Sequence, residues 1–222
     1  KAKTLVTRYI GGLPSDVSKT FKAVDTGMRP INTSKRVDFA KGNEPKSTTL
    51  LKYTGEIESY DLAEDFKLYL LEEVLKIKLT ESLREQLSGV YTVGVGTEYA
   101  RQPYPNYSIT LTIPSAPENV DALVAAAKKE IEALRSQGPS LADFAKVKEN
   151  YLTGLAIRQK ENSYWLGKLA QFDYDGMDPS LIPEYNRNLL ANMSLIDLQQ
   201  AARRYFNVNH VFEAVLSPEP IP

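Results

Sequence analysis

Apolar and polar residues alternate along this chain with two periods, and each period predicts one kind of element. A period of 3.6 keeps one face apolar from Leu62 to Leu83 and predicts a long buried helix. A period of two, typical of a strand with one buried face, runs through residues 91–99 and again through 107–113. Because the loop 101–106 joins these two segments, we expect them to form a hairpin.

The rest of the chain continues this mixture of strands and helices. Alternation over residues 36–41 and 47–55, on either side of the turn residues 42–45, predicts another hairpin. Asp61 followed by Glu64 predicts a capping box at the start of the long helix. The further predicted elements are helices over 117–138, from Ser140 to Leu155 with a continuation to Trp165 left open, over 181–190 and over 195–206, and a last strand over 208–216.

Strands in pairs and helices in runs are typical of the α+β class, so we expect a largely antiparallel mixed sheet with helices packed on one face. Residues 1–14 have helical spacing that stops at Gly11 and Gly12, which predicts the end of a preceding domain. Residues 15–34 have few periodic apolar positions and are predicted to be a linker. Residues 35–222 would then form one domain.

Composition and charge exclude several classes of partner. The 222 residues are 42% hydrophobic and 25% charged, which is ordinary globular composition. The net charge is -1 and no Lys/Arg block exceeds a pair, so the sequence predicts no nucleic-acid partner and no anionic lipid surface. No apolar run reaches the roughly 18 residues of a membrane span. Without cysteine, the chain has no disulfide, thiolate zinc site or cysteine nucleophile, and its compartment stays undetermined.

The candidate chemistry lies at one corner between helix and strand. Gly89 is expected to stop the long helix, because only glycine takes the left-handed conformation without steric cost. Arg84 and Tyr91 then flank a defined turn. A guanidinium suits carboxylates and carbonyls, and a phenol can donate one hydrogen bond, so the pair could hold a peptide carbonyl. From the residues alone, an ion pair of Arg84 with Glu81 and a core position for Tyr91 are the simpler interpretations.

Other polar groups indicate structure rather than chemistry. Acidic residues at helical spacing over 72–85 predict a solvated face. Gly94 and Gly96 lack the third glycine of a dinucleotide-binding loop. His210 has no histidine partner, and a catalytic zinc needs three protein ligands, so we expect a structural histidine on the last strand. Tyrosines around the loop 101–106 predict core packing or, if exposed, a rim that contacts peptides.

The order of several segments resembles the C-terminal half of the insulinase/pitrilysin family of zinc metallopeptidases, specifically the last domain of its bacterial single-chain type. The resemblance covers nearly the whole chain and rests on the ordered set of motifs. These motifs are Leu-Arg-Glu-Gln-Leu-Ser-Gly-Val-Tyr at 83–91, Pro-Glu-Asn-Val-Asp-Ala-Leu at 117–123, Gly-Pro-Ser-Leu at 138–141, Asn-Ser-Tyr-Trp-Leu at 162–166, and the apparent domain end at 5–14.

The resemblance implies that the zinc lies elsewhere in a longer protein. The family's site is an inverted His-x-x-Glu-His helix with a further glutamate, and this chain has neither. The implied cofactor is therefore zinc in the full-length protein, with none bound by this segment, which should be inactive alone. The implied partners are the N-terminal zinc-bearing half of the same protein and a peptide or protein substrate. The resemblance also favours the periplasm or cell envelope.

The resemblance assigns roles to the corner residues. The two halves of such a peptidase enclose a substrate chamber. Arg84 would hold a substrate carbonyl, and Tyr91 would donate to the oxygen that becomes anionic during attack on the scissile carbonyl. Two alternatives remain: a family member that has lost catalysis and serves as a structural or scaffolding subunit, and an unrelated α+β binding module. Arg84 and Tyr91 favour the peptidase over the scaffold, which needs neither.

Overall fold

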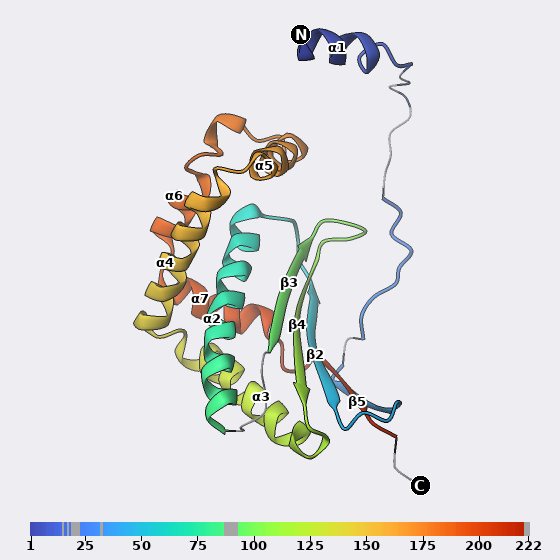
Figure 1. The fold of residues 1–222 in the computed structure, drawn as a ribbon, viewed down its shortest axis with the longest axis vertical. Coiled ribbons are helices and arrows are strands. Elements are labelled where there is room, and N and C mark those ends of the chain that lie inside the picture. The colour runs from blue at the N-terminus through green and yellow to red at the C-terminus, as the bar shows by residue number, and fades with distance from the viewer. Residues whose placement is uncertain (15, 17, 19–22, 32, 87–92, 220–222) are drawn as a thin grey trace.

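The computed structural model describes residues 1–14, 16, 18, 23–31, 33–86 and 93–219, and within them the side chains of 84–86 are not described. A mixed sheet carries helices on one of its faces (Figure 1), as the sequence predicts. The strands are β1 (Lys35–Ala40), β2 (Ser47–Glu56), β3 (Gly94–Ala100), β4 (Asn106–Ser115) and β5 (Val211–Ser217). The helices are α1 (Ala2–Tyr9), α2 (Leu62–Gln86), α3 (Val120–Gln137), α4 (Leu141–Arg158), α5 (Asn162–Tyr174), α6 (Tyr185–Asn192) and α7 (Leu195–Tyr205).

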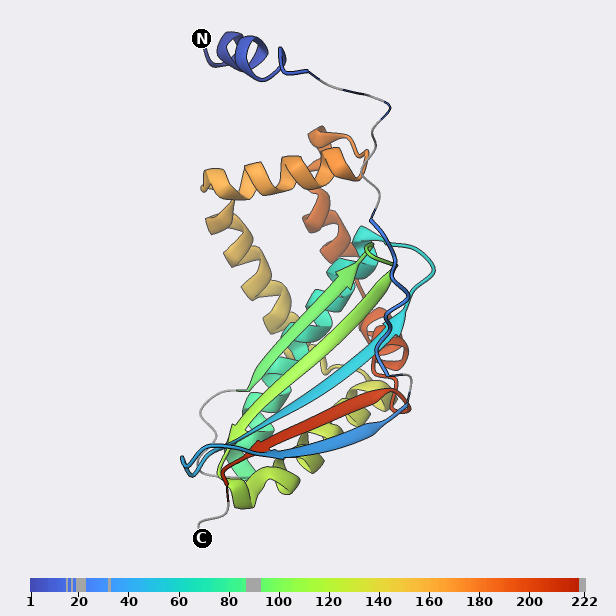
Figure 2. The ribbon, with the colours of Figure 1, turned by 90° about the vertical axis from the view of Figure 1, so that its right-hand side faces the viewer.

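The strand order is β1-β5-β2-β4-β3, and β5 lies between β1 and β2 (Figure 2). β1 is parallel to β5, and the other pairs are antiparallel. The predicted hairpin of residues 36–41 and 47–55 is therefore wrong. The turn between β1 and β2 does reverse the direction of the chain. However, β5, which follows much later in the sequence, lies between these two strands and pairs with both. The predicted hairpin of β3 and β4 is confirmed.

The core lies between the sheet and α2. Alternate residues of β4, such as Ile109 and Leu111, are buried on the helical side, as their period of two predicts. α2 contacts β3, α3, α4 and α7. Leu68, Leu71 and Leu75 are therefore buried in addition to the predicted stripe. The predicted single apolar face therefore describes α2 incompletely. This helix lies at the centre of the domain rather than on its surface, so more than one of its faces is buried.

Local signals fix the start of α2 only in part. Asp61 Oδ1 accepts hydrogen bonds from the backbone N–H groups of Ala63 at 2.6 Å and Glu64 at 3.2 Å, as expected of an N-cap. Glu64 does not complete the predicted capping box. Its carboxylate instead accepts hydrogen bonds from Tyr205 Oη at 2.5 Å and from Lys67. A hydrogen bond to Tyr205, which is distant in the sequence, thus replaces the local hydrogen bond of the predicted capping box.

The segment after α4 differs most from the prediction. α4 ends at Arg158 instead of continuing to Trp165, and α5 is a separate helix. Trp165 Nε1 donates to the carbonyl of Gln159 at 2.8 Å and so fastens the turn between them. The predicted helix over 181–190 is a 3₁₀ turn, Pro179–Leu181, followed by α6. The predicted helix over 195–206 is α7, and Ser194 with Asp197 forms a complete capping box at its start.

The first helix stands apart from this domain. α1 has no buried residue and lies away from the helices that cover the sheet (Figure 1). Leu5, Val6, Tyr9 and Ile10 are all exposed. The division into residues 1–14, 15–34 and 35–222 stays a prediction. None of the helices in the described part of the chain is long and apolar enough to cross a membrane.

Candidate functional site

The predicted corner of Arg84 and Tyr91 joins α2 to β3. The structure confirms this order of helix and strand, and the buried Leu83 and Val93 hold the two elements in the core on either side. The side chain of Arg84 and the whole of Tyr91 lie outside the described residues. Their proximity and the face they reach therefore stay predictions.

A charged contact ties α2 to the start of α4 near this corner. Lys78 Nζ lies 2.8 Å from Asp143 Oδ2, which also accepts from Ser140 Oγ at 2.5 Å. Ser140 caps α4, as predicted, by accepting from the N–H of Asp143 at 3.0 Å. Burial raises the pKa of Asp143, but Lys78 and Ser140 outweigh it and hold the pKa below its ordinary value. The last turns of α2 are thus braced from the side.

A cavity of about 500 Å³ opens between α2, α4, α5 and α6, with β3 at its side. We call it the α2–α5 pocket. Its floor is a cluster of three rings from two helices. Tyr69 and Phe66 of α2 meet Tyr151 of α4 at centroid distances of 5.8 and 5.0 Å. Asn186 Nδ2 donates a hydrogen bond to the Tyr151 hydroxyl oxygen at 2.5 Å. The pocket therefore has an aromatic base with fixed ring positions.

Two cations reach this pocket without a carboxylate partner. Lys168 Nζ donates to Gln171 Oε1 at 2.8 Å, and the Arg158 guanidinium lies 5.4 Å from the ring centroid of Tyr151. Arg158 can fold back because Gly154 has no side chain, since a Cβ there would meet its Nη1 at 2.9 Å. Among the described residues, neither cation lies within ion-pair distance of a carboxylate, although Asp65 and Asp175 attract Lys168 from farther away. Burial lowers the pKa of Lys168 and outweighs the attraction of Asp65.

The acidic groups of the α2–α5 pocket, in contrast, are already engaged. Glu72 binds Lys76 Nζ at 2.7 Å through one oxygen and Thr97 Oγ1 of β3 at 2.5 Å through the other. Asp65 accepts from Tyr60 Oη at 3.2 Å, and burial raises its pKa. The pocket therefore offers positive charge and hydrogen-bond donors to a ligand.

No pattern in the sequence predicts this pocket. Its walls come from helices far apart in the chain, and no spacing in the sequence relates Tyr69 to Lys168. The sequence presents the segment around Trp165 as a family motif and as an open continuation of the helix from Ser140, so it does not predict α5 as a separate helix. The pocket forms only when the turn after Arg158 brings α5 across α2 and α4.

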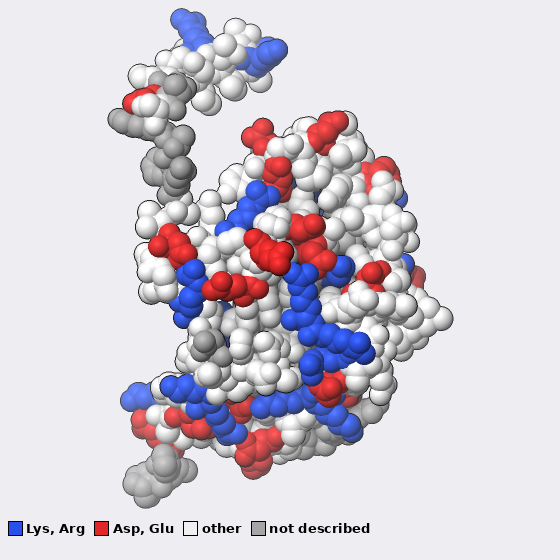
Figure 3. Space-filling model, turned by 180° about the vertical axis from the view of Figure 1, so that it is seen from behind, with Lys and Arg blue, Asp and Glu red and all other residues white. Residues whose placement is uncertain are grey.

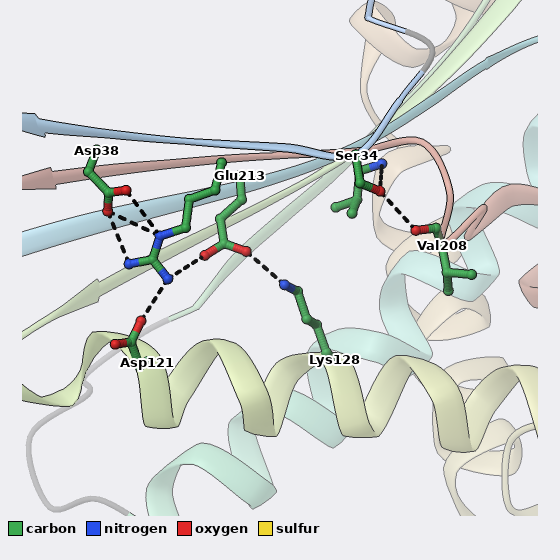
Figure 4. A network of polar contacts seen from close by, with 8 residues as sticks. Ser34, Asp38, Asp121, Lys128, Val208 and Glu213 are labelled. Carbon is green, nitrogen blue, oxygen red and sulfur yellow. Dashed lines mark hydrogen bonds and ion pairs between the residues drawn. The ribbon is translucent and has the colours of Figure 1, made fainter.

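A second polar cluster lies at the β1 edge of the sheet and is structural (Figure 4). Glu213 of β5 is 5% exposed, with Oε1 3.2 Å from Arg36 Nη1 and Oε2 2.7 Å from Lys128 Nζ. Arg36 also binds Asp38 and Asp121, the latter at 2.7 Å. Ser34 Oγ donates to the carbonyl of Val208 at 3.0 Å. These bonds fasten β1 to β5 and α3.

The described residues of this chain do not fit a metal centre. Within the described ranges, no group of three or more His, Cys, Asp or Glu side chains is placed to hold a metal ion. The sequence has one histidine and no cysteine. His210 lies in the turn before β5, not on the strand as predicted. On the face in Figure 3, basic and acidic side chains lie beside one another, consistent with the balanced net charge.

The tyrosines around the β3–β4 loop separate into two kinds. Tyr99 and Tyr107 are buried, as the packing interpretation predicts. Tyr104 is half-buried, and the guanidinium of Arg29 lies 3.6 Å from its ring centroid. They do not form one exposed rim.

The sheet order, the helical layer on one face and the α2–β3 connection together define a two-layer α+β domain, and no metal-binding group occurs among its described residues. Residues 1–151 match the protein-family model described as the peptidase M16 inactive domain. The chain therefore belongs to the peptidase M16 family. The predicted membership in the insulinase/pitrilysin peptidases, through their non-catalytic part, is confirmed.

Solved structures show the same fold. The periplasmic protease PqqL from Escherichia coli has 22% identity and a TM-score of 0.78, with 98% of this chain covering 24% of PqqL. The ferredoxin protease FusC, in complex with Arabidopsis ferredoxin, has 16% identity and a TM-score of 0.77, over 99% of this chain and 24% of FusC. A protease from Helicobacter pylori has 15% identity and a TM-score of 0.80, over 97% and 52%. A search of the curated proteins found no match.

The chain thus spans about a quarter of PqqL and of FusC and about half of the Helicobacter pylori protease. At these identities the likeness shows the fold alone. The family is one of peptidases, and the part that this chain matches is described as its inactive domain.

Proposed function

We propose that this chain is the non-catalytic C-terminal segment of a zinc-dependent endopeptidase, where it closes the substrate chamber and supplies Arg84 and Tyr91 to the substrate. The match of residues 1–151 to the peptidase M16 inactive domain carries the proposal, and the corner that contains both residues lies within that match.

The two side chains would act at different stages. Tyr91 would donate a hydrogen bond to the oxygen on which negative charge develops as the scissile carbonyl is attacked. Arg84 would hold a neighbouring substrate carbonyl through its planar fork of donors. The order of a long helix, α2, followed in the chain by the strand β3 supports a corner at this place, and Lys78 and Asp143 connect the helix to α4.

In this proposal the zinc is held by the N-terminal half of the same protein; among the described residues of this chain, no group of three or more His, Cys, Asp or Glu side chains is placed to hold a metal ion. That half is the proposed partner, and the proposed substrate is a peptide or protein. The FusC structure contains a protein, ferredoxin, which is in keeping with substrates of that class. The description of PqqL as periplasmic supports a periplasmic location for this protein.

Kinetics of the protein that joins this chain to its N-terminal half test the proposal. Tyr91→Phe should lower kcat on the order of 10²-fold or more and change KM little, because the lost donor serves charge that appears only in the transition state. Arg84→Ala should impair both kcat and KM, since that side chain touches the substrate before and during the reaction. Steady-state rates on a fluorogenic peptide measure both effects.

Tyr174→Phe is the matched control, because this tyrosine is exposed on α5. It should leave both constants unchanged. A Tyr91→Phe enzyme with wild-type kcat would contradict the proposed role and leave this segment only the task of closing the chamber. A joined protein without peptidase activity would favour the scaffolding alternative.

A further inference from the structure

The α2–α5 pocket has the size and the lining of a site for a small organic molecule. Its volume of about 500 Å³ lies within the range of roughly 300–1,000 Å³ that is typical of such sites, which combine aromatic walls with a few polar groups. The pocket has no part in the proposed function. Among the described residues, the aromatic side chains that line it come from four helices and are Phe66, Tyr69, Tyr151, Tyr164, Phe172 and Tyr185.

Several of these rings leave part of their surface free for a ligand. Tyr69, Tyr164 and Tyr185 are half-buried. Tyr151 packs edge to face against Tyr69 at a centroid distance of 5.8 Å. Phe172 packs in the same way against Tyr185 at 5.3 Å. Because rings held in this manner can receive a further ring in an edge-to-face or offset arrangement, the pocket favours a ligand with an aromatic body.

The positive charges of the pocket favour an anionic group on that ligand. Among the described residues, no carboxylate lies within ion-pair distance of Lys168 or Arg158. Burial lowers the pKa of Lys168, and the charge of Arg158 lowers it further, in spite of the two more distant carboxylates. An anion beside both side chains would offset their mutual repulsion and form charge-assisted hydrogen bonds with them.

The acidic side chains of the pocket limit the charge of that anion. Glu72 and Asp65 line the same cavity and already accept hydrogen bonds, from Thr97 and Tyr60 respectively. Both carboxylates would repel a second negative charge on the ligand. A carboxylate, with one charge, therefore fits better than a phosphate monoester, which carries about -1.5 to -2 at neutral pH.

We propose that the α2–α5 pocket binds a small aromatic carboxylic acid, whose ring lies against Tyr69 and Tyr151 and whose carboxylate binds Lys168 and Arg158. The ring would rest on α2 and α4, while the carboxylate would reach α5. The ligand would thus fasten α5 over the other two helices. Since α5 buries only Phe172, such a contact adds substantially to what holds this helix in place.

This site is distinct from the proposed catalytic corner. Glu72, at the pocket, and Arg84 are separated by twelve residues of α2, which is about 18 Å along the helix axis. Binding at the pocket requires neither zinc nor the N-terminal half, so it is measured on this chain alone. Tyr91→Phe should leave the affinity for the acid unchanged even if it slows the joined peptidase. The two proposals can therefore fail separately.

NMR titrations with phenylacetate and phenylacetamide measure the contribution of the carboxylate. The two probes share a ring and differ in charge. Phenylacetate should bind about ten-fold more tightly, the size expected for a charge-assisted hydrogen bond. Equal affinities would overturn carboxylate recognition. Absence of phenylacetate binding up to about 10 mM, the weakest affinity expected of a ligand of this size, would overturn the proposal as a whole.

Two further probes test the class of ligand. Cyclohexylacetate keeps the carboxylate but has no aromatic ring, and it should bind more weakly than phenylacetate. Phenyl phosphate keeps the ring but carries more negative charge, and it should also bind more weakly because of the two acidic side chains at the pocket. Equal or tighter binding of cyclohexylacetate would contradict the aromatic site, and tighter binding of phenyl phosphate would contradict the preference for a single charge.

Charge-removing variants locate the site. Lys168→Gln and Arg158→Gln should each weaken binding of phenylacetate about ten-fold and leave phenylacetamide unaffected. Lys160→Gln removes the same charge from an exposed position outside the pocket and should change neither affinity. Lys168→Arg keeps the charge and should keep most of the affinity, which guards against a folding defect in the glutamine variant. Unchanged binding in both glutamine variants would overturn the proposal.

Hydrogen–deuterium exchange tests the fastening of α5. At about ten times its dissociation constant, phenylacetate should slow exchange of the α5 amides about ten-fold, because the helix can open only after the ligand leaves. The same concentration should have a much smaller effect in Lys168→Gln. Amides of α3, which does not line the pocket, should exchange as before. Slower exchange in α3 without a change in α5 would place the ligand elsewhere and overturn the proposal.

Discussion

At the scale of single residues, Tyr205 shows how one buried side chain joins three elements. It is 0% exposed at the end of α7, and its ring lies 4.9 Å from that of Tyr107 in β4. Its hydroxyl donates to Glu64 Oε2 of α2 at 2.5 Å. Burial raises the pKa of Glu64, but Lys67 and Tyr205 outweigh it, so the pKa lies below its ordinary value of 4.5. The contact thus favours the charged carboxylate in the folded protein.

Removing this hydroxyl should weaken the fold in a pH-dependent way. Tyr205→Phe should cost about 1–2 kcal/mol in the free energy of unfolding at neutral pH, since a buried hydrogen bond to a charged group is lost. A depressed carboxylate pKa stabilises the fold above its unfolded value, and this stability is lost as the pH falls through the folded value. The difference from wild type should therefore shrink as the pH is lowered from neutral to well below the ordinary value of 4.5.

Urea denaturation at both ends of this pH range measures this change, and Tyr104→Phe is the control. Tyr104 is half-buried, and its hydroxyl has no hydrogen-bond partner among the described residues, so its removal should be nearly neutral. A difference between Tyr205→Phe and wild type that stays constant as the pH is lowered well below 4.5 would contradict the coupling to Glu64.

At the scale of elements, β1 is the strand most dependent on side chains. It pairs only with β5 among the described strands, and Arg36 connects it to the buried Glu213. Lys128 of α3 approaches the same carboxylate from the other side. A buried carboxylate is costly unless it is paired, so both cations are needed to keep Glu213 in the sheet.

Lys128→Met should lower the free energy of unfolding by about 1–3 kcal/mol, because Glu213 Oε2 loses its donor at a nearly buried position. Lys129→Met removes a neighbouring, exposed charge on the same helix and should change stability by less than about 0.5 kcal/mol. Melting temperatures of the two variants compare them directly. Equal destabilisation would show that the effect comes from α3 itself rather than from the contact with β5.

At the scale of the whole molecule, α1 contributes no buried surface to the domain. Its apolar residues face solvent, and the helix lies apart from the sheet and its helical layer (Figure 1). The open face of the sheet also exposes apolar side chains, including Phe39 and Leu216. Both surfaces are consistent with the proposal that other parts of a longer protein pack against this segment.

Deleting residues 1–13 should therefore leave the melting temperature of this chain unchanged within about 2 °C, since no buried contact is removed. In the joined protein, the same helix is expected to pack on the preceding domain. Replacing Leu5 and Ile10 there by Asp should then destabilise the protein by about 2 kcal/mol or more, which differential scanning calorimetry would detect. A melting temperature lowered by the deletion in the isolated chain would show that α1 belongs to this domain instead.

The sequence by itself determined most of the elements, because their causes are local. The period-two pattern of β3 and β4, the serine caps of α4 and α7 and the apolar stripe of α2 each act within a few residues. The family motifs could also be recognised in the sequence, since they depend on residue types at fixed spacing. The match over residues 1–151 confirms the family membership that they imply.

Only the tertiary structure decided how these elements meet. Strand pairing depends on which backbone edge is free, so β5 could enter between β1 and β2 although the turn of residues 42–45 favours a direct hairpin. The carboxylate of Glu64 accepts a hydrogen bond from Tyr205 instead of capping α2 locally, because burial strengthens this distant hydrogen bond. The α2–α5 pocket likewise exists because the chain turns after Arg158 and packs α5 over α2 and α4. This packing brings Lys168 close to Tyr69, and no spacing in the sequence relates these two residues.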